Sequence, residues 1–172
     1  MKKILSVLTL VIGMFAFAQK IPSEMKTEFN KKALQDTVET INGESISLEN
    51  ALEKYKGNIT VIDLYAIWCG DCIKGLPKLK ELQANNPDVK FIFLSMDRSK
   101  EAWKEGIEKY EIKGDYLYMG NNWKNDFSTY IDLNWIPRYL ILDQNGKIAN
   151  YYTVKADDPT VQSTLNSLRV KI

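Results

Sequence analysis

Two cysteines separated by two residues are the groups in this chain best suited to covalent chemistry. Cys69 and Cys72 are its only cysteines, and the 172-residue sequence contains no histidine. They follow Trp68, where a predicted buried strand turns into a predicted helix, so Cys69 should begin that helix. Unpaired backbone N–H groups at a helix start stabilise a thiolate and lower its pKa from about 8.5 toward roughly 3.5–7.5. Cys72, one turn further on, can then attack a mixed disulfide formed on Cys69.

Other uses of the pair fit the sequence less well. A disulfide between Cys69 and Cys72 closes a very small loop and adds little stability, which argues against a purely structural disulfide. A soft ion such as Cu(I) is an alternative occupant. The absence of histidine and of further cysteines counts against a closed zinc site, so we expect no metal. A thiol peroxidase is a further alternative, although no Pro/Thr motif frames either cysteine.

The residues between and beside the cysteines should tune the chemistry. Gly70 gives the backbone freedom to place both sulfurs within bonding distance. Asp71 brings a negative charge near the Cys69 thiolate, which favours a reductant. Trp68 is expected to shield the disulfide and to border a groove. Lysines on the following helix are interpreted as a solvated face.

The elements that must position this pair follow an α/β pattern. Apolar, β-rich runs predict central strands at residues 59–67 and 89–96, with the helix of residues 70–84 between them. The remaining predicted elements are a hairpin at 38–48 turning at Asn42-Gly43, a short helix from Ser47 to Tyr55, a helix to Tyr110 capped by Ser99, a short helix at 122–131, a hairpin with strands 139–142 and 147–152, and a terminal helix opened by Asp158-Pro159. Trp103 and Trp123 are assigned to core or insertion packing.

Composition and the N-terminus indicate one exported domain. Apolar residues make up 45% and charged residues 26%, and the formal net charge of +1 gives no reason to expect a nucleic-acid partner. Residues 1–18 have the positive start, short apolar run and small-x-small end of a signal peptide, although retention as an anchor remains an alternative. We expect a flexible segment at 19–35 and the folded domain at 36–172, outside the cytoplasm of a bacterial cell and monomeric.

Several motifs together resemble the thioredoxin superfamily. The run Asp63–Cys72 (DLYAIWCGDC), Pro77 and Ile136-Pro137 before a strand are similar to thioredoxin. The upstream hairpin, the helical insertion at 97–131 and the run Leu142–Lys147 (LDQNGK) look more like its extracytoplasmic TlpA/ResA branch. The resemblance spans roughly residues 36–168. It implies a thioredoxin-like fold, a central mixed β-sheet flanked by helices, with an N-terminal β-hairpin and a helical insertion.

The resemblance also implies roles for individual residues. Asp63 matches the buried acid that accepts a proton from the second thiol, although a satisfied core carboxylate is the alternative. The Ile136–Pro137 bond should be cis and face the cysteines, so that the Ile136 backbone pairs with a client segment between Trp68 and Trp135. The implied function is reduction of disulfides in exported client proteins by a Cys69/Cys72 dithiol–disulfide cycle, with no other cofactor and an extracytoplasmic or membrane electron donor. Oxidase or isomerase activity with the same residues is the alternative.

Overall fold

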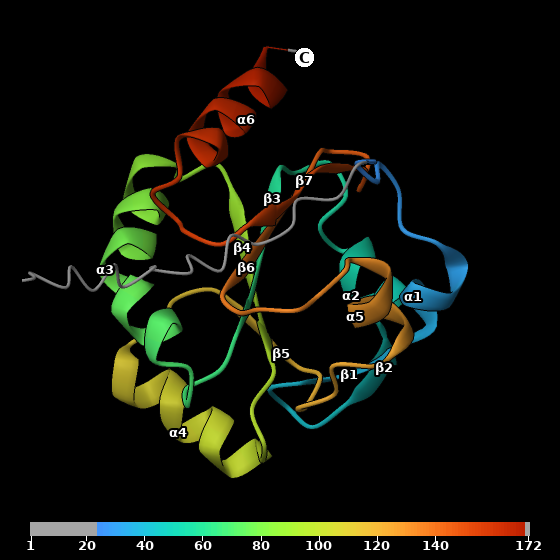
Figure 1. Ribbon diagram of the computed structural model, residues 1–172, viewed down its shortest axis with the longest axis vertical. Helices are drawn as coiled ribbons and strands as arrows, with labels where there is room; N and C mark the ends of the chain where they lie inside the picture. Colours follow the sequence, from blue (N-terminus) through green and yellow to red (C-terminus); the bar gives the residue numbers. More distant parts are fainter. Residues whose placement is uncertain (1–23, 171–172) are drawn as a thin grey trace, which may run out of the picture.

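The computed structural model describes residues 24–170, which form a seven-stranded mixed sheet with helices on both faces (Figure 1). The strand order is β2-β1-β5-β4-β3-β6-β7, with β3, β4 and β5 parallel and the other pairs antiparallel. The strands are β1 (Thr37–Thr40), β2 (Ser45–Ser47), β3 (Thr60–Tyr65), β4 (Lys90–Ser95), β5 (Asp115–Tyr118), β6 (Arg138–Leu142) and β7 (Ile148–Thr153). The helices are α1 (Lys31–Gln35), α2 (Leu48–Glu53), α3 (Gly70–Asn85), α4 (Lys100–Tyr110), α5 (Asp126–Tyr130) and α6 (Pro159–Arg169). The predicted signal peptide lies outside the described residues.

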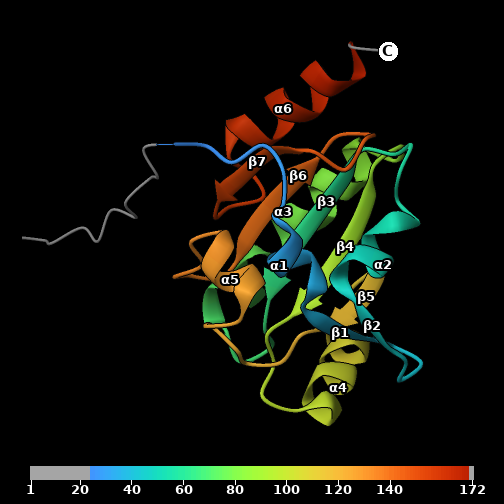
Figure 2. The same ribbon diagram turned by 90° about the vertical axis from the view of Figure 1, so that its right-hand side faces the viewer.

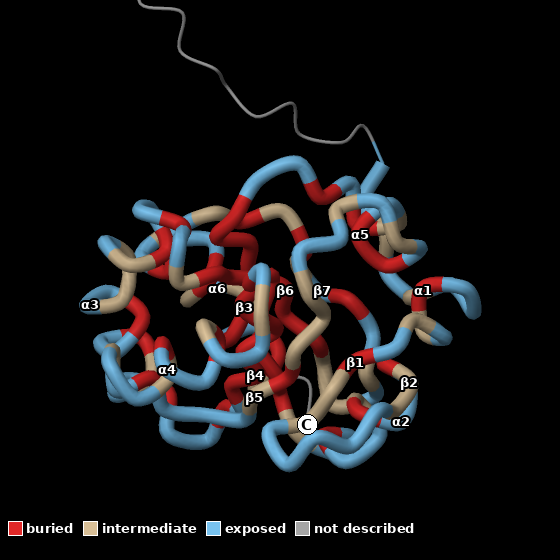
Figure 3. Tube along the Cα trace, turned by 90° about the horizontal axis from the view of Figure 1, so that it is seen from below, coloured by how far each residue is buried: buried red, intermediate tan, exposed pale blue. Residues whose placement is uncertain are grey.

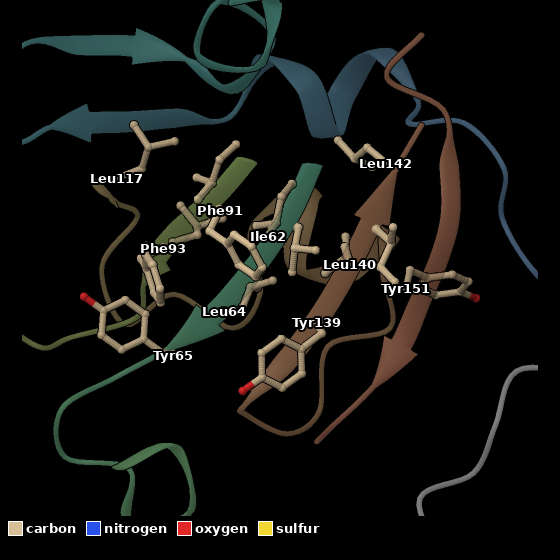
Figure 4. Packing of buried hydrophobic residues seen from close by; sticks show 14 of the residues in the cluster. Ile62, Leu64, Tyr65, Phe91, Phe93, Leu117, Tyr139, Leu140, Leu142 and Tyr151 are labelled. Carbon is tan, nitrogen blue, oxygen red and sulfur yellow. The ribbon is translucent and has the colours of Figure 1, made fainter. Parts of the chain in front are cut away.

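The sheet separates two layers of helices. Helices α3, α4 and α6 lie on one face, and α1, α2 and α5 cover the other, which faces the viewer in Figure 2. All six residues of β3 and all five of β6 are buried, as expected of strands covered on both sides. Figure 3 shows this buried centre beneath an exposed outer layer, and Figure 4 shows the side chains of β3, β4 and β6 packed together.

The predicted hairpins, central strands and helix caps are confirmed. Ser47 and Ser99 each accept a hydrogen bond, at 3.2 Å, from a backbone N–H in the first turn of α2 and α4. Asp158 caps α6 in the same way at 2.8 Å. Each cap satisfies one of the N–H groups that a helix start leaves unpaired. Gly43 has a φ of 88°, so the hairpin turn uses the left-handed region that glycine tolerates.

The predicted helical insertion at 97–131 is wrong in one respect, because it contributes a strand to the central sheet. Strand β5 pairs with β4 on one side and with β1 on the other. It has only four residues, too few for a period-two pattern to be recognised. The preceding Gly114 has a φ of 152°, and a Cβ there would lie 2.6 Å from the Phe93 ring, so glycine is needed where the chain enters β5. Helix α5 is also shorter than predicted.

The segment before the first strand contains regular structure that its sequence does not indicate. Asn30 caps α1, and Ala33 of this helix is fully buried. Further upstream, the Thr27 carbonyl accepts a 2.8 Å hydrogen bond from Ile148 N–H of β7. The short, lysine-rich helix carries too few apolar residues for its pattern to be visible in the sequence. None of the helices in the described part of the chain is long and apolar enough to cross a membrane.

Candidate active site

The cysteine pair lies at the junction of β3 and α3, as predicted. Cys69 is the N-cap of α3, and its sulfur accepts a 3.2 Å hydrogen bond from Cys72 N–H. The two residues form a disulfide with their Cα atoms 5.3 Å apart. The side chain that would carry a thiolate in the reduced protein therefore already faces a backbone donor of the first helical turn, and this contact stabilises an anion.

The loop before Cys69 is held by the connection between β4 and α4. Asp97 is fully buried, and its Oδ1 accepts a 2.8 Å hydrogen bond from Ile67 N–H. Its Oδ2 accepts another, also 2.8 Å, from the Ser95 hydroxyl. Burial raises the pKa of Asp97, while the two hydrogen bonds oppose this shift. The side chain of Ile67 packs against Gly106 of α4, where a Cβ would come within 2.0 Å of it. Sequence reasoning did not identify Asp97, because an aspartate after a strand carries no distinctive signal.

An aromatic hollow of about 330 Å³ opens beside Cys69 and not beside Cys72. The predicted groove residues Trp68, Trp135 and Ile136 line it, and the two tryptophans are 43% and 49% exposed. Both exposed rings line the same hollow as Cys69. Arg98 adds a cation–π contact to Trp68, with 5.4 Å between the guanidinium carbon and the ring centroid.

Two further residues line the hollow without having been expected there. Trp123, expected in core or insertion packing, packs against the core and also lines this hollow, and Asn134 is a further lining residue. No local pattern could have shown this position, since it depends on how the α5 region folds back over the sheet.

The loop before β6 faces the cysteines. The Ile136–Pro137 peptide bond is cis, as predicted. The Ile136 carbonyl oxygen lies 3.4 Å from Cys69 Sγ, so a reduced Cys69 thiol at this place could donate to it. The Ile136 N–H has no hydrogen-bond partner within residues 24–170. Pro137 and Trp135 also line a second hollow of about 350 Å³, bounded by Asp71, Lys155 and other residues of α3 and of the β7–α6 connection.

Asp63 lies in the middle of β3, beside Tyr139 of β6 and Phe93 of β4. It is 3% exposed, and its Oδ1 has no hydrogen-bond partner among the described residues. Burial raises the pKa of Asp63 from 3.8 to about 8, because an apolar environment disfavours the charged form. A carboxyl with this pKa can take up or release a proton near neutral pH.

Gly70 and Asp71 form the first turn of α3. Gly70 has no positive φ, and a Cβ on it would meet no atom within 4 Å, so the backbone does not require the freedom we expected. Asp71 is exposed and lines both hollows. Residues 24–170 contain no group of three or more His, Cys, Asp or Glu side chains that could hold a metal ion. The arrangement is suited to thiol–disulfide exchange at Cys69.

Comparison with known proteins also points to thiol–disulfide exchange. Residues 57–148 match the thioredoxin-like family. The thiol–disulfide oxidoreductase ResA of Bacillus cereus is 27% identical over 147 residues, covering 84% of this chain and 81% of that protein. A solution structure described as a thiol–disulfide oxidoreductase from Bacteroides vulgatus is 34% identical, with a TM-score of 0.67 over 83% of this chain and 91% of the other.

A secreted Mycobacterium tuberculosis disulfide oxidoreductase shares the fold at 19% identity and a TM-score of 0.57, covering 83% of this chain and all of the other. The two closer similarities extend over most of the chain. This chain belongs to the thioredoxin-like family, and it is a thiol–disulfide oxidoreductase with the CxxC pair Cys69–Cys72.

Proposed function

We propose that this protein reduces disulfide bonds of exported proteins, with Cys69 as the attacking thiol. The observation that carries the proposal is the placement of Cys69 at the start of α3, where it lines the aromatic hollow while Cys72 does not. A client sulfur that enters the hollow would meet Cys69 first. The extracytoplasmic location is supported by the similarity to ResA and to a secreted oxidoreductase.

The exchange proceeds in two balanced steps. The Cys69 thiolate attacks one sulfur of the client disulfide, and the other client sulfur leaves as a thiolate, which gives a mixed disulfide. Cys72 then loses its proton and attacks the Cys69 sulfur, which releases the second client thiolate and forms the Cys69–Cys72 disulfide. Two electrons pass from the protein to the client, and an extracytoplasmic donor must return them.

Asp63 is the proposed acceptor of the Cys72 proton. Its pKa of about 8 keeps a fraction ionised at neutral pH, and burial makes it a stronger base than an exposed carboxylate. The position on β3, the strand that leads to the cysteines, without a partner for Oδ1, supports this role over that of a satisfied core carboxylate.

The client segment would bind beside the Ile136–Pro137 bond. The unpartnered Ile136 N–H can pair with an extended client backbone, as an edge strand does. The rings of Trp68 and Trp135 can cover apolar side chains of the client. Recognition through the backbone suits an enzyme with several clients.

The reductive direction is supported by the charge of Asp71. At about 6 Å in a watery setting, this charge would destabilise the Cys69 thiolate by about 0.7 kcal/mol. That corresponds to about 15 mV toward a more reducing potential for two electrons. Gly70 would contribute to this tuning only through its lack of a side chain, which leaves the start of α3 open beside Asp71.

The test uses two matched variants expressed in the exporting cell. Cys72→Ser should accumulate mixed disulfides with client proteins, because the resolving thiol is missing, whereas Cys69→Ser should accumulate few. Equal trapping by both variants would contradict the assignment of roles. Equilibration of the wild-type protein with glutathione buffers tests the direction, and a potential as oxidising as about −120 mV would exclude the reductive role.

Export itself is tested on the same cells. N-terminal sequencing of the extracytoplasmic protein should find a chain that starts at Gln19. A membrane-bound chain that starts at Met1 would favour the anchor.

A further inference from the structure

Arg138 is a buried cation without a carboxylate partner among the described residues. It begins β6 directly after Pro137 and is fully buried. No ion pair involves it within residues 24–170, and its guanidinium carbon lies 4.1 Å from the centroid of the Tyr152 ring. A buried charge is costly unless hydrogen bonds and polarisable neighbours compensate for it. The contacts that Arg138 does make therefore indicate what it holds in place.

Its two hydrogen bonds are made to the segment before β6, which forms one wall of the aromatic hollow. Arg138 Nη2 donates to Asn134 Oδ1 at 2.9 Å, and Nη1 donates to the Ile131 carbonyl at 3.3 Å. Trp135 and Ile136, which line the hollow, lie between Asn134 and Arg138 in the chain. The guanidinium thus ties the start of this loop to the first residue of β6.

The contact also fixes which end of the Asn134 amide faces outward. Arginine has only donors, so it must face the oxygen of the amide, and the NH₂ group points away from it. Asn134 is exposed and lines the hollow with the three tryptophans. Its Nδ2 donates to no atom of the described residues. A mainly aromatic hollow beside Cys69, which Asp71 also lines, therefore carries an oriented amide donor with no partner among the described residues.

We propose that Asn134 is a specificity-determining residue, oriented by Arg138, that donates a hydrogen bond to a carbonyl oxygen of the client next to the client's disulfide. This inference rests on the proposed function, because it concerns the same hollow. A few placed polar groups in an apolar site fix the orientation of what binds there. The carbonyl can belong to the client backbone or to a side-chain amide, and these two sources are separated by experiment.

The experiment measures the second-order rate at which the reduced protein reacts with three disulfides. Two are disulfide-linked peptides that differ only in having Leu or Asn on both sides of the cysteine. The third is hydroxyethyl disulfide, which is small and has no carbonyl. Asn134→Leu removes the donor, and Asn134→Asp keeps an acceptor for Arg138 but cannot donate.

Both Asn134 variants should react about fivefold more slowly with peptide, the usual effect of losing one hydrogen bond, and normally with hydroxyethyl disulfide. An equal loss for the two peptides identifies the backbone carbonyl as the acceptor. A loss confined to the Asn peptide identifies the side-chain amide. Unchanged peptide rates, or an equal loss with hydroxyethyl disulfide, would overturn the inference.

Arg138→Met tests the orienting role. It should lower the ratio of peptide to hydroxyethyl disulfide rates in the wild-type background and leave that ratio unchanged in the Asn134→Leu background. A further fall in the double variant would show that Arg138 does not act through Asn134. If Arg138→Met does not fold, the two Asn134 variants still decide the main point, because Asn134 is exposed. A wild-type protein that reduces none of the three disulfides would instead refute the proposed function.

Discussion

Replacing the buried Asp63 with asparagine should change how stability depends on pH. The oxidised protein holds this carboxyl in a site where burial raises its pKa from 3.8 to about 8, and in the unfolded chain it should titrate near its ordinary value. Between these two pKa values the folded state keeps the proton and the unfolded state releases it. The stabilisation that comes from the protonated Asp63 carboxyl is therefore complete below about pH 4 and is lost as the pH rises through about 8.

The size of the effect follows from the shift. One pKa unit corresponds to 1.36 kcal/mol, so the wild-type protein should lose about 1.4 kcal/mol of unfolding free energy per pH unit relative to Asp63→Asn. A shift of about four units sums to about 5 kcal/mol, with about 2 to 3 kcal/mol of it between pH 6 and pH 8. The neighbouring Tyr65 and Tyr139 have pKa values raised above 10 by burial, so they do not titrate in this range.

Urea unfolding of the oxidised protein from pH 4 to pH 9 measures this difference. The exposed Glu44→Gln controls for the change in net charge, and its curve should run nearly parallel to that of the wild type. If the Asp63→Asn curve is also parallel, then Asp63 is not protonated in the folded protein at neutral pH, and the argument for it as an acid–base group fails. In the reduced protein, Asp63→Asn should additionally slow release of the client from the mixed disulfide.

Three further variants test contacts around the site by unfolding free energy. Gly106→Ala should destabilise the protein by about 1 to 3 kcal/mol, because its Cβ would overlap Ile67; a neutral effect would mean that Ile67 moves aside without cost. Asp97→Ala should lower the unfolding free energy by about 1 to 3 kcal/mol and speed amide hydrogen exchange at Ile67, whose N–H loses its acceptor. Unchanged exchange would show that the Asp97–Ile67 hydrogen bond does not hold this loop. Asp158→Ala should cost about 1 kcal/mol by removing the α6 cap, and no loss would mean that water replaces it.

The sequence was informative where a local pattern has one physical meaning. The buried strand that ends before Trp68, the helix that begins at Cys69 and the capping serines all follow from burial, dipoles and unpaired N–H groups over a few residues. The cysteine spacing likewise restricts the chemistry, because two thiols one helical turn apart can exchange a disulfide between them. These features were correctly placed because each depends on neighbours in the chain.

The features that were missed depend on residues far apart in the sequence. Strand β5 is recognisable only once β1 and β4 lie on either side of it. Trp123 and Asn134 reach the hollow because the chain folds back between β5 and β6. The hydrogen bond from Ile67 N–H to Asp97 joins the segments that follow β3 and β4, and nothing in the sequence near Asp97 indicates this partner.

The place of β5 in the sheet also has a consequence for how the chain is made. Residues 37–47 are synthesised well before β5, yet an isolated two-stranded hairpin is at best marginally stable in water. Thr40 of this hairpin has its partner at Leu117, so docking must wait until most of the domain has been synthesised. A chain interrupted before β5 would expose unpaired edges on both the hairpin and β4, which invites pairing with other chains. A chain of this intermediate length is therefore more prone to associate with other chains than the complete domain is.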